Sequence, residues 1–405
     1  MGSIYLINIT GQNQPGLLEA LCSSLQEQPV ELLDVSQAVI HASLALSLIL
    51  HFPDPQQSKP VLKELLYQAH DLSLDLEFSC IGPEEYQNWS KQTEGKTYIL
   101  TLLGRSLNTE HLFRISSLVR QNQLDIAQID RLSDRRPLTQ EHEDQGLTCI
   151  EMELNGNPGD LGRMRSEFLA LSRLYPVDIG LQEDTPYRRH RRLIAFDMDS
   201  TLIQSEVIDE LAFQAGAGPQ VQEITSKAMQ GELDFKQSLQ KRVSLLQGLD
   251  CSVLEQVARG LTLTQGAQRL IQNLKILGYK IAIISGGFTY FGRYLQDMLE
   301  IDYLFANELE IEQGKLTGKI QGEVVDGQKK AELLQHLASQ EDISLEQVIA
   351  VGDGANDLPM LNLAGLGIAF HAKPMVRQGA KQAISNVGLD AVLYFLGLKD
   401  KEAIV

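Results

Sequence analysis

LIAFDMDSTL, residues 193–202 of the 405-residue chain, joins a short apolar run to two aspartates. An uncharged run of this length flanked by polar residues predicts a buried strand of a parallel sheet. Asp197 and Asp199 follow at the carboxyl end of that strand, where open α/β sheets bind their ligands. The alternative is a turn in which one of these residues only caps the next helix. A calcium loop is excluded, because Leu202 stands where such a loop requires glycine.

Further segments downstream carry polar residues that can join this pair. The run YKIAII (279–284) ends in Ser285-Gly286-Gly287, and the run VIAV (348–351) ends in GDGAND, residues 352–357. Between them, Lys330 stands near the start of an amphipathic helix. In a doubly wound sheet these strand ends converge on one crevice. Each residue alone could be a helix cap or a solvated charge, but together and in this order they predict one active site.

These residue types fit phosphoryl transfer, which needs an in-line nucleophile, neutralised phosphoryl oxygens and a proton for the leaving group. We expect Asp197 to be the nucleophile that forms an aspartyl-phosphate. Asp199 would protonate the leaving alkoxide and later take a proton from water. Mg²⁺ is expected between the carboxylates, with Asp197, Asp199 and Asp353 as its predicted ligands. The groups expected to hold the remaining phosphoryl oxygens are Lys330, the Ser285 hydroxyl and the Gly286 N–H.

The order Asp-x-Asp-Ser-Thr, Ser-Gly-Gly, Lys, Gly-Asp-Gly-x-Asn-Asp resembles the haloacid dehalogenase superfamily of phosphohydrolases. Three segments of the insert resemble its phosphoserine phosphatase family: DSTLIQSEVIDE (199–210), AMQGELDF (228–235) and SLQKRVSLL (238–246). The resemblance runs from about residue 191 to residue 398. It implies an Mg²⁺-dependent hydrolase that converts O-phospho-L-serine to L-serine and phosphate, the last step of serine biosynthesis.

The resemblance also implies which residues bind the substrate. Those matching Glu206 and Arg242 bind its amino-acid end, and those matching Ser285, Gly286, Lys330 and Asn356 hold the phosphate. Arginine suits a carboxylate, because its planar guanidinium donates two parallel hydrogen bonds. The helical insert from about 207 to 263 would cover the crevice as a cap. The alternative to substrate binding is that Arg242 is only a surface charge and that Glu206 is only an acid in the first turn of a helix.

The first half of the chain shows a strand-helix-strand-strand-helix-strand order twice. The first copy has predicted strands at 4–9, 32–40, 44–52 and 72–78, with helices at 17–25 and 60–66. The second copy has predicted strands at 97–104, 124–131, 147–154 and 177–181, with helices at 108–120 and 160–171. This is the order of a ferredoxin-like unit, and the pair resembles tandem ACT domains, which bind amino acids at their interfaces. The first copy keeps the Pro15-Gly16 typical of that family, whereas the second has Ser106-Leu107-Asn108-Thr109.

We therefore expect ACT-like domains at 1–90 and 91–186. An α/β domain of haloacid dehalogenase type, with a doubly wound parallel sheet, is expected at 187–405. The ACT-like pair predicts a homodimer with L-serine as a regulatory ligand. The basic run RRHRR (188–192) is expected to be an exposed linker.

Composition excludes several other classes of protein. A net charge of -18 argues against a nucleic-acid partner. We expect no membrane association, because there is no signal-peptide pattern at the start and the longest apolar stretch is too short to span a bilayer. Four cysteines without metal or disulfide spacing fit a reducing compartment. The expected location is the cytoplasm.

Two other functions remain open from the sequence. One is a phosphatase or phosphotransferase for another small phosphomonoester, with homoserine as a possible acceptor. The other is an amino-acid-sensing regulator whose phosphatase half is inactive. The presence of Asp197, Asp199, Lys330 and Asp353 argues against the regulator.

Overall fold

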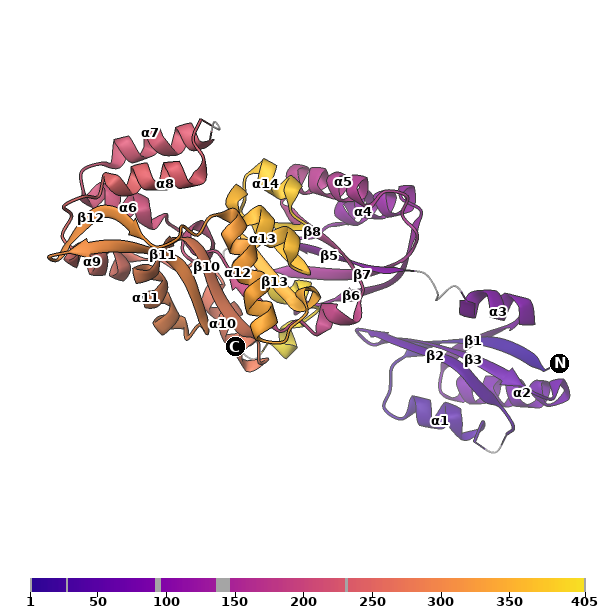
Figure 1. Cartoon of the computed structure of the whole chain (residues 1–405). Coiled ribbons are helices and arrows are strands. Elements are labelled where there is room, and N and C mark those ends of the chain that lie inside the picture. Colours follow the sequence, from indigo (N-terminus) through magenta and orange to yellow (C-terminus); the bar gives the residue numbers. More distant parts are fainter. Residues whose placement is uncertain (1, 27, 92–95, 136–145, 230–231, 404–405) are drawn as a thin grey trace. The chain divides into compact units, whose positions relative to one another are not determined.

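The computed structural model describes residues 2–26, 28–91, 96–135, 146–229 and 232–403 (Figure 1). The chain divides into two compact units, Met1–Gly95 and Lys96–Val405, which are described separately. The second unit contains both a ferredoxin-like sheet and the sheet that carries the catalytic motifs.

The first unit is a four-stranded antiparallel sheet with two helices packed on one face. Its strand order is β2-β3-β1-β4, which confirms the predicted ferredoxin-like arrangement. Its elements are β1 (Ser3–Gln12), α1 (Leu17–Ser23), β2 (Glu31–Ile40), β3 (Ser43–Phe52), α2 (Pro55–Asp71), β4 (Leu74–Ile81) and α3 (Pro83–Lys91). Leu21 of α1 and Leu65 of α2 share one core with Ile7 and Ile9 of β1. Helix α3 was not predicted.

Two features of this unit bear on ligand and partner binding. Gly16 has a φ of +84°, which glycine adopts without strain, and a side chain there would meet open space. Strand β2 lies at the edge of the sheet and exposes apolar side chains, including Leu32, Val35 and Ile40. An uncovered apolar edge strand can pair with another chain.

The second unit begins with another ferredoxin-like sheet, in the order β6-β7-β5-β8. Its elements are β5 (Thr97–Gly104), α4 (Thr109–Gln121), β6 (Leu124–Arg131), β7 (Thr148–Gly156), α5 (Leu161–Leu174) and β8 (Val177–Glu183). The segment that replaces Pro-Gly in this copy has a structural role. Asn108 caps α4: its side chain accepts a hydrogen bond from the His111 N–H, and the His111 ring accepts one from the Asn108 N–H.

The catalytic sheet has seven strands in the order β12-β11-β10-β9-β13-β14-β15. They are β9 (Leu193–Phe196), β10 (Lys280–Phe288), β11 (Tyr303–Glu312), β12 (Lys315–Gln321), β13 (Val348–Gly352), β14 (Leu366–Phe370) and β15 (Gln382–Ile384). All neighbouring pairs are parallel except β11 and β12, so the predicted parallel sheet is confirmed with one antiparallel edge hairpin that was not predicted.

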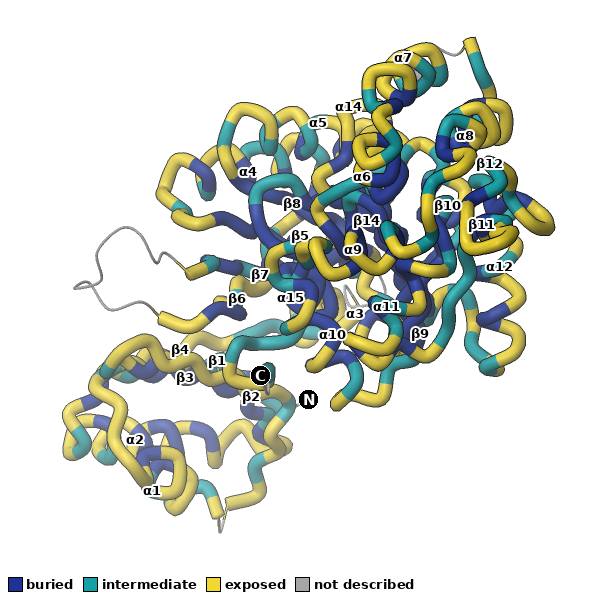
Figure 2. The backbone as a smooth tube through the Cα atoms, turned by 90° about the vertical axis from the view of Figure 1, so that its left-hand side faces the viewer, coloured by how far each residue is buried: buried dark blue, intermediate teal, exposed yellow. Residues whose placement is uncertain are grey.

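Helices cover both faces of this sheet. They are α10 (Ala267–Ile276), α11 (Thr289–Leu299), α12 (Gly327–Gln340), α13 (Leu358–Leu363), α14 (Pro374–Gly379) and α15 (Val392–Phe395). Strand β9 is buried on both sides, because Ile194 and Phe196 belong to one hydrophobic core and Leu193 and Ala195 to the other. Strand β9 and most of its neighbour β10 are buried, and Figure 2 labels both.

The predicted helical cap is present between β9 and β10. It consists of α6 (Val207–Gln214), α7 (Gly218–Met229), α8 (Phe235–Ser244) and α9 (Ser252–Gly260). In Figure 1, α6, α7 and α8 lie together at the end of this unit that is far from β5–β8. An apolar set on these helices, including Leu211, Leu239 and Val243, is buried in the core that they share with the sheet.

The expectation that 188–192 is an exposed linker is wrong for two of its arginines. Arg188 is fully buried and forms an ion pair with Glu151 of β7. Arg191 is 7% exposed and donates a hydrogen bond to the Gln182 side chain at 3.0 Å. Both guanidinium groups find partners in the second ferredoxin-like sheet, and these partners allow them to be buried.

The second ferredoxin-like sheet is tied to the catalytic domain by further buried hydrogen bonds. Asp178 of β8 accepts from the backbone N–H groups of Ser385 and Asn386 at 2.8 and 2.9 Å. The Gln182 side chain donates to the Phe395 carbonyl at 3.0 Å. The domain boundary expected between residues 186 and 187 therefore falls inside one compact unit.

We predict that Arg188→Met strongly destabilises this unit, because it leaves the Glu151 carboxylate buried without its cation. The free energy of unfolding should fall by about 3–5 kcal/mol, the usual cost of breaking a buried pair. Chemical denaturation followed by circular dichroism measures this change. The double variant Arg188→Met/Glu151→Leu should recover most of the loss. Lys96→Met, which removes an exposed pair with Glu183, is the control and should change little.

Candidate active site

Three adjacent parallel strands bring the predicted motifs together. Phe196, the last residue of β9, is in register with Ile283 of β10 and Val351 of β13. Asp197 follows β9 and Asp353 follows β13, while Ser285 lies within the last part of β10. The carboxyl ends of the three strands therefore present these residues at one edge of the sheet, as predicted.

Lys330 lies beneath this edge and is fully buried. Its Nζ is 2.9 Å from Asp197 Oδ1 and 2.6 Å from Asp357 Oδ1. Burial alone lowers the pKa of Lys330, but the two carboxylates more than offset this and raise it above its ordinary value. The lysine is therefore charged and positioned next to the predicted nucleophile, on the first turn of a helix whose N-cap is Asp326.

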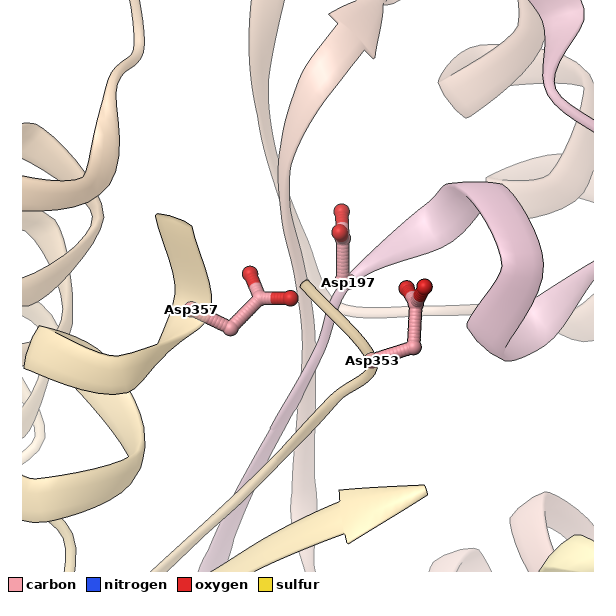
Figure 3. A group of neighbouring side chains, drawn as sticks. All are labelled: Asp197, Asp353 and Asp357. Carbon is pink, nitrogen blue, oxygen red and sulfur yellow. The ribbon is translucent and has the colours of Figure 1, made fainter. Parts of the chain in front are cut away.

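Asp197, Asp353 and Asp357 form a carboxylate cluster. One oxygen from each lies within 4.8 Å of the others. Figure 3 shows the three side chains, which come from the ends of β9 and β13 and from the turn before α13. Burial, followed by repulsion from Asp197, raises the pKa of Asp353 to about 8 and that of Asp357 to about 6. A hard divalent cation would relieve this repulsion, so the donor set fits a metal ion.

This cluster differs from the predicted metal ligands in one member. The cluster contains Asp357, whereas Asp353 was the acid of the GDGAND motif that the sequence predicted as a ligand. The carboxylate of Asp199, which was also predicted, does not belong to any such group among the described residues. The second acid of the motif was a signal that could have identified Asp357. Gly352 leaves room for it, because a Cβ at that position would be 2.5 Å from the Asp357 carboxyl carbon.

Asp199 lies in the same crevice with a different environment. Its Oδ1 accepts a hydrogen bond from the Val207 N–H at 3.0 Å. Burial, together with the nearby carboxylates of Glu206 and Asp197, raises the pKa of Asp199 well above its ordinary value. A carboxyl group that holds its proton is suited to donate it to a leaving oxygen.

Glu206 and Arg242 project from the cap into the same cavity. Glu206 is the N-cap residue of α6 and accepts a hydrogen bond from the Ser200 hydroxyl at 2.9 Å. Burial lowers the pKa of Arg242, while the charges of Glu206 and Asp209 act in the opposite direction. Within the described part of the chain, the buried Nε of Arg242 has no hydrogen-bond partner, so it can donate to a ligand.

The predicted site residues other than Lys330 line one cavity between cap and sheet: Asp197, Asp199, Glu206, Arg242, Ser285, Gly286, Asp353 and Asn356. Phe235 of α8 closes over Gly286, where an added Cβ would be 2.7 Å from its ring. Arg105, from the loop after β5, also lines the cavity. The sequence gives no signal for Arg105, because its loop reaches the site only through the packing of the two sheets.

Comparisons with known proteins agree with this geometry. Residues 194–362 match the family model of haloacid dehalogenase-like hydrolases, and residues 3–79 match that of the ACT domain. A phosphoserine phosphatase of Streptomyces coelicolor is 38% identical over 98% of this chain and 93% of its own length. One from Mycobacterium tuberculosis is 37% identical over 97% of this chain and 93% of its own.

This chain belongs to the phosphoserine phosphatase family. The crystal structure of a probable phosphoserine phosphatase from Vibrio cholerae is also similar, with 35% identity, a TM-score of 0.58, and coverage of 76% of this chain and 87% of that one. The family membership confirms the resemblance inferred from the motifs, and the match at residues 3–79 identifies the first unit as an ACT domain.

We predict that a divalent cation stabilises the protein through the carboxylate cluster. At a concentration one hundred times its dissociation constant it should add about 2.7 kcal/mol to the free energy of unfolding. Thermal denaturation with metal and with chelator measures the effect. Asp353→Asn removes one ligand and should weaken it, whereas Asp250→Asn, an exposed acid outside the cluster, should not. An unchanged metal effect in Asp353→Asn would place the ion elsewhere.

Proposed function

We propose that this enzyme hydrolyses O-phospho-L-serine to L-serine and phosphate, the last step of serine biosynthesis. The observation that carries the proposal is one cavity whose lining combines the paired acids Asp197 and Asp199 with Glu206 and Arg242 from the cap. Lys330 lies behind this lining, with its Nζ 2.9 Å from Asp197 Oδ1. Phosphoserine has a phosphate at one end and an amino-acid group at the other.

At the phosphate end, the Asp197 carboxylate attacks phosphorus while the bond from phosphorus to the serine oxygen breaks. Asp199 gives that oxygen its proton, and L-serine leaves. Asp199 then takes a proton from water, whose oxygen attacks phosphorus and releases phosphate and the free Asp197. Ser285, the Gly286 N–H, Lys330 and Asn356 are proposed to hold the phosphoryl oxygens.

We propose Mg²⁺ as the metal, held by Asp197, Asp353 and Asp357. When bound, it would neutralise charge on the phosphoryl group. Mg²⁺ is a hard ion that prefers oxygen ligands, and the carboxylates of this cluster supply them. This assignment leaves the Asp199 carboxylate for proton transfer.

At the amino-acid end, Arg242 is proposed to donate a pair of hydrogen bonds to the substrate carboxylate, using its free Nε. Glu206 is proposed to accept the substrate ammonium. These two proposed roles rest on the position of both residues in the lining of the cavity. They also rest on charge, because the arginine would meet the substrate carboxylate and the glutamate would meet the substrate ammonium.

We predict that Arg242→Ala impairs turnover of O-phosphoserine far more than turnover of O-phosphoethanolamine, which lacks the carboxylate. The loss in kcat/KM for phosphoserine should be roughly ten- to a hundredfold, because one charged hydrogen-bonding partner is removed. Phosphate release measures both reactions. Asp197→Asn should abolish both.

Equal losses on the two substrates would place Arg242 at the phosphate or in the scaffold. Better turnover of phosphothreonine than of phosphoserine, or efficient transfer to homoserine, would favour the alternative of another small phosphomonoester. Absence of phosphate release from every ester would favour the inactive regulator.

We further propose that the chain has ACT-like domains at 1–90 and 91–186 and a phosphatase domain at 187–405, and that it forms a homodimer in the cytoplasm. The exposed edge strand β2 supports pairing through the first ACT domain. The open space around Gly16 supports L-serine binding there, with backbone N–H groups meeting its carboxylate. Among the described residues, no helix is long and apolar enough to cross a membrane.

We predict that a chain starting at Lys96 keeps metal-dependent hydrolysis but loses the dimer and any L-serine effect beyond product inhibition. A start near residue 189 would instead remove Arg188 and β8 and expose the face of the catalytic domain that they cover. Light scattering and kinetics with added L-serine test the shorter chain. The same mass and the same serine dependence as the full chain would contradict the regulatory proposal.

A further inference from the structure

A second cavity, of about 270 Å³, lies where the second ferredoxin-like sheet meets the catalytic domain. Its walls come from α5 and β8 on one side and from α14 and β15 on the other, all within the unit Lys96–Val405. Helices α5 and α14 lie next to each other in both views (Figures 1 and 2). None of its lining residues belongs to the active-site cavity.

Three cationic side chains line this cavity: Arg165 of α5, Arg377 of α14 and Lys381. In the part of the chain that the structure describes, none of them forms an ion pair. The acid in the lining is Asp178, whose oxygens already accept hydrogen bonds from Ser385 and Asn386. The cavity therefore has an excess of positive charge.

These cations keep hydrogen-bonding capacity for a ligand. Arg377 donates from Nη1 to the Ser385 hydroxyl at 3.2 Å, but its buried Nε has no partner among the described residues. Lys381 donates to the Ala364 carbonyl at 2.8 Å, which leaves two of its three N–H groups. Burial and the charge of Arg165 lower the pKa of Lys381, against the opposing effect of Glu346. A bound anion would relieve that repulsion.

The rest of the lining limits the size and character of the ligand. The lining also includes the apolar residues Phe168, Leu169, Ile179 and Leu181. Pockets for drug-sized molecules have volumes of roughly 300–1,000 Å³, so this cavity suits a smaller molecule. A single carboxylate would leave two cations uncompensated, whereas a phosphate group carries up to two charges and matches guanidinium geometry.

We propose that this cavity binds a small phosphate-bearing anion through Arg165, Arg377 and Lys381. The proposal does not depend on the catalytic function. It places the anion close to the active site, because α14 contributes to both cavities. Pro374 and Met375 line the active site, and Arg377, about one helical turn further on, lines the second cavity.

The test is a calorimetric titration with inorganic phosphate in the presence of beryllium fluoride, which blocks the active site if Asp197 is the nucleophile. Phosphate binding is assigned to the second cavity only where Arg165→Ala or Arg377→Gln weakens it, so this assignment holds even if the active site stays open. We expect wild type to bind one further phosphate per chain. Arg165→Ala and Arg377→Gln should each weaken this binding by roughly ten- to a hundredfold, since each removes one charged partner. Arg173→Ala is the matched control, because Arg173 is an exposed arginine of α5 outside the cavity, and it should bind as wild type does.

Phenylphosphonate distinguishes the source of the phosphate group. Tighter binding than inorganic phosphate indicates an organic phosphate whose apolar part contacts Phe168 and Leu169, and equal binding indicates phosphate itself. No second binding event in wild type, or equal affinity in Arg165→Ala and Arg173→Ala, would overturn the proposal. Because Arg165 is exposed, Arg165→Ala is expected to fold. Its phosphate affinity therefore tests the proposal even if Arg377→Gln fails to fold. Failure of the catalytic proposal appears separately, as no phosphate release from O-phosphoserine.

Discussion

The active site depends on one buried cation between two buried carboxylates. Moving an ammonium group out of water costs several kcal/mol, and the cost is offset only by close and well-formed pairing. Lys330 has that pairing with Asp197 and Asp357, and all three are almost wholly inaccessible to solvent. The pairing fixes the start of α12 against the end of β9 and the turn before α13. Burial and repulsion from Asp197 raise the pKa of Asp357 to about 6, and the charge of Lys330 opposes that rise.

The same constraint explains why two acids separated by one residue behave differently. Asp197 faces the lysine, whereas Asp199 faces Glu206 and a backbone N–H from α6. Asp197 therefore lies next to a cation, whereas Asp199 lies next to another acid. The glycines of the neighbouring strand make this possible, because a Cβ at Gly287 would be 2.5 Å from Asp199 Oδ2. Chemistry and packing therefore depend on the same few contacts.

Most of the fold could be predicted because its signals are local. The apolar runs that became β9, β10 and β13 are continuous in the sequence, and each is followed directly by the residues that enter the site. The errors concern features whose cause lies far along the chain. Arg188 is buried because Glu151, 37 residues earlier, is there to receive it. No property of the run 188–192 itself distinguishes that arginine from an exposed one.

The two ferredoxin-like sheets share a strand order but differ in their exposed surfaces and in their contacts. The first exposes an apolar edge strand and keeps an open glycine turn, whereas the second uses the equivalent turn to cap α4. The second sheet is joined to the catalytic domain through Asp178, Gln182 and Arg188, and Arg105 from the same sheet reaches the active-site cavity. Moving that sheet away would leave a buried arginine and a buried aspartate without partners. Opening this junction would therefore destabilise the unit Lys96–Val405.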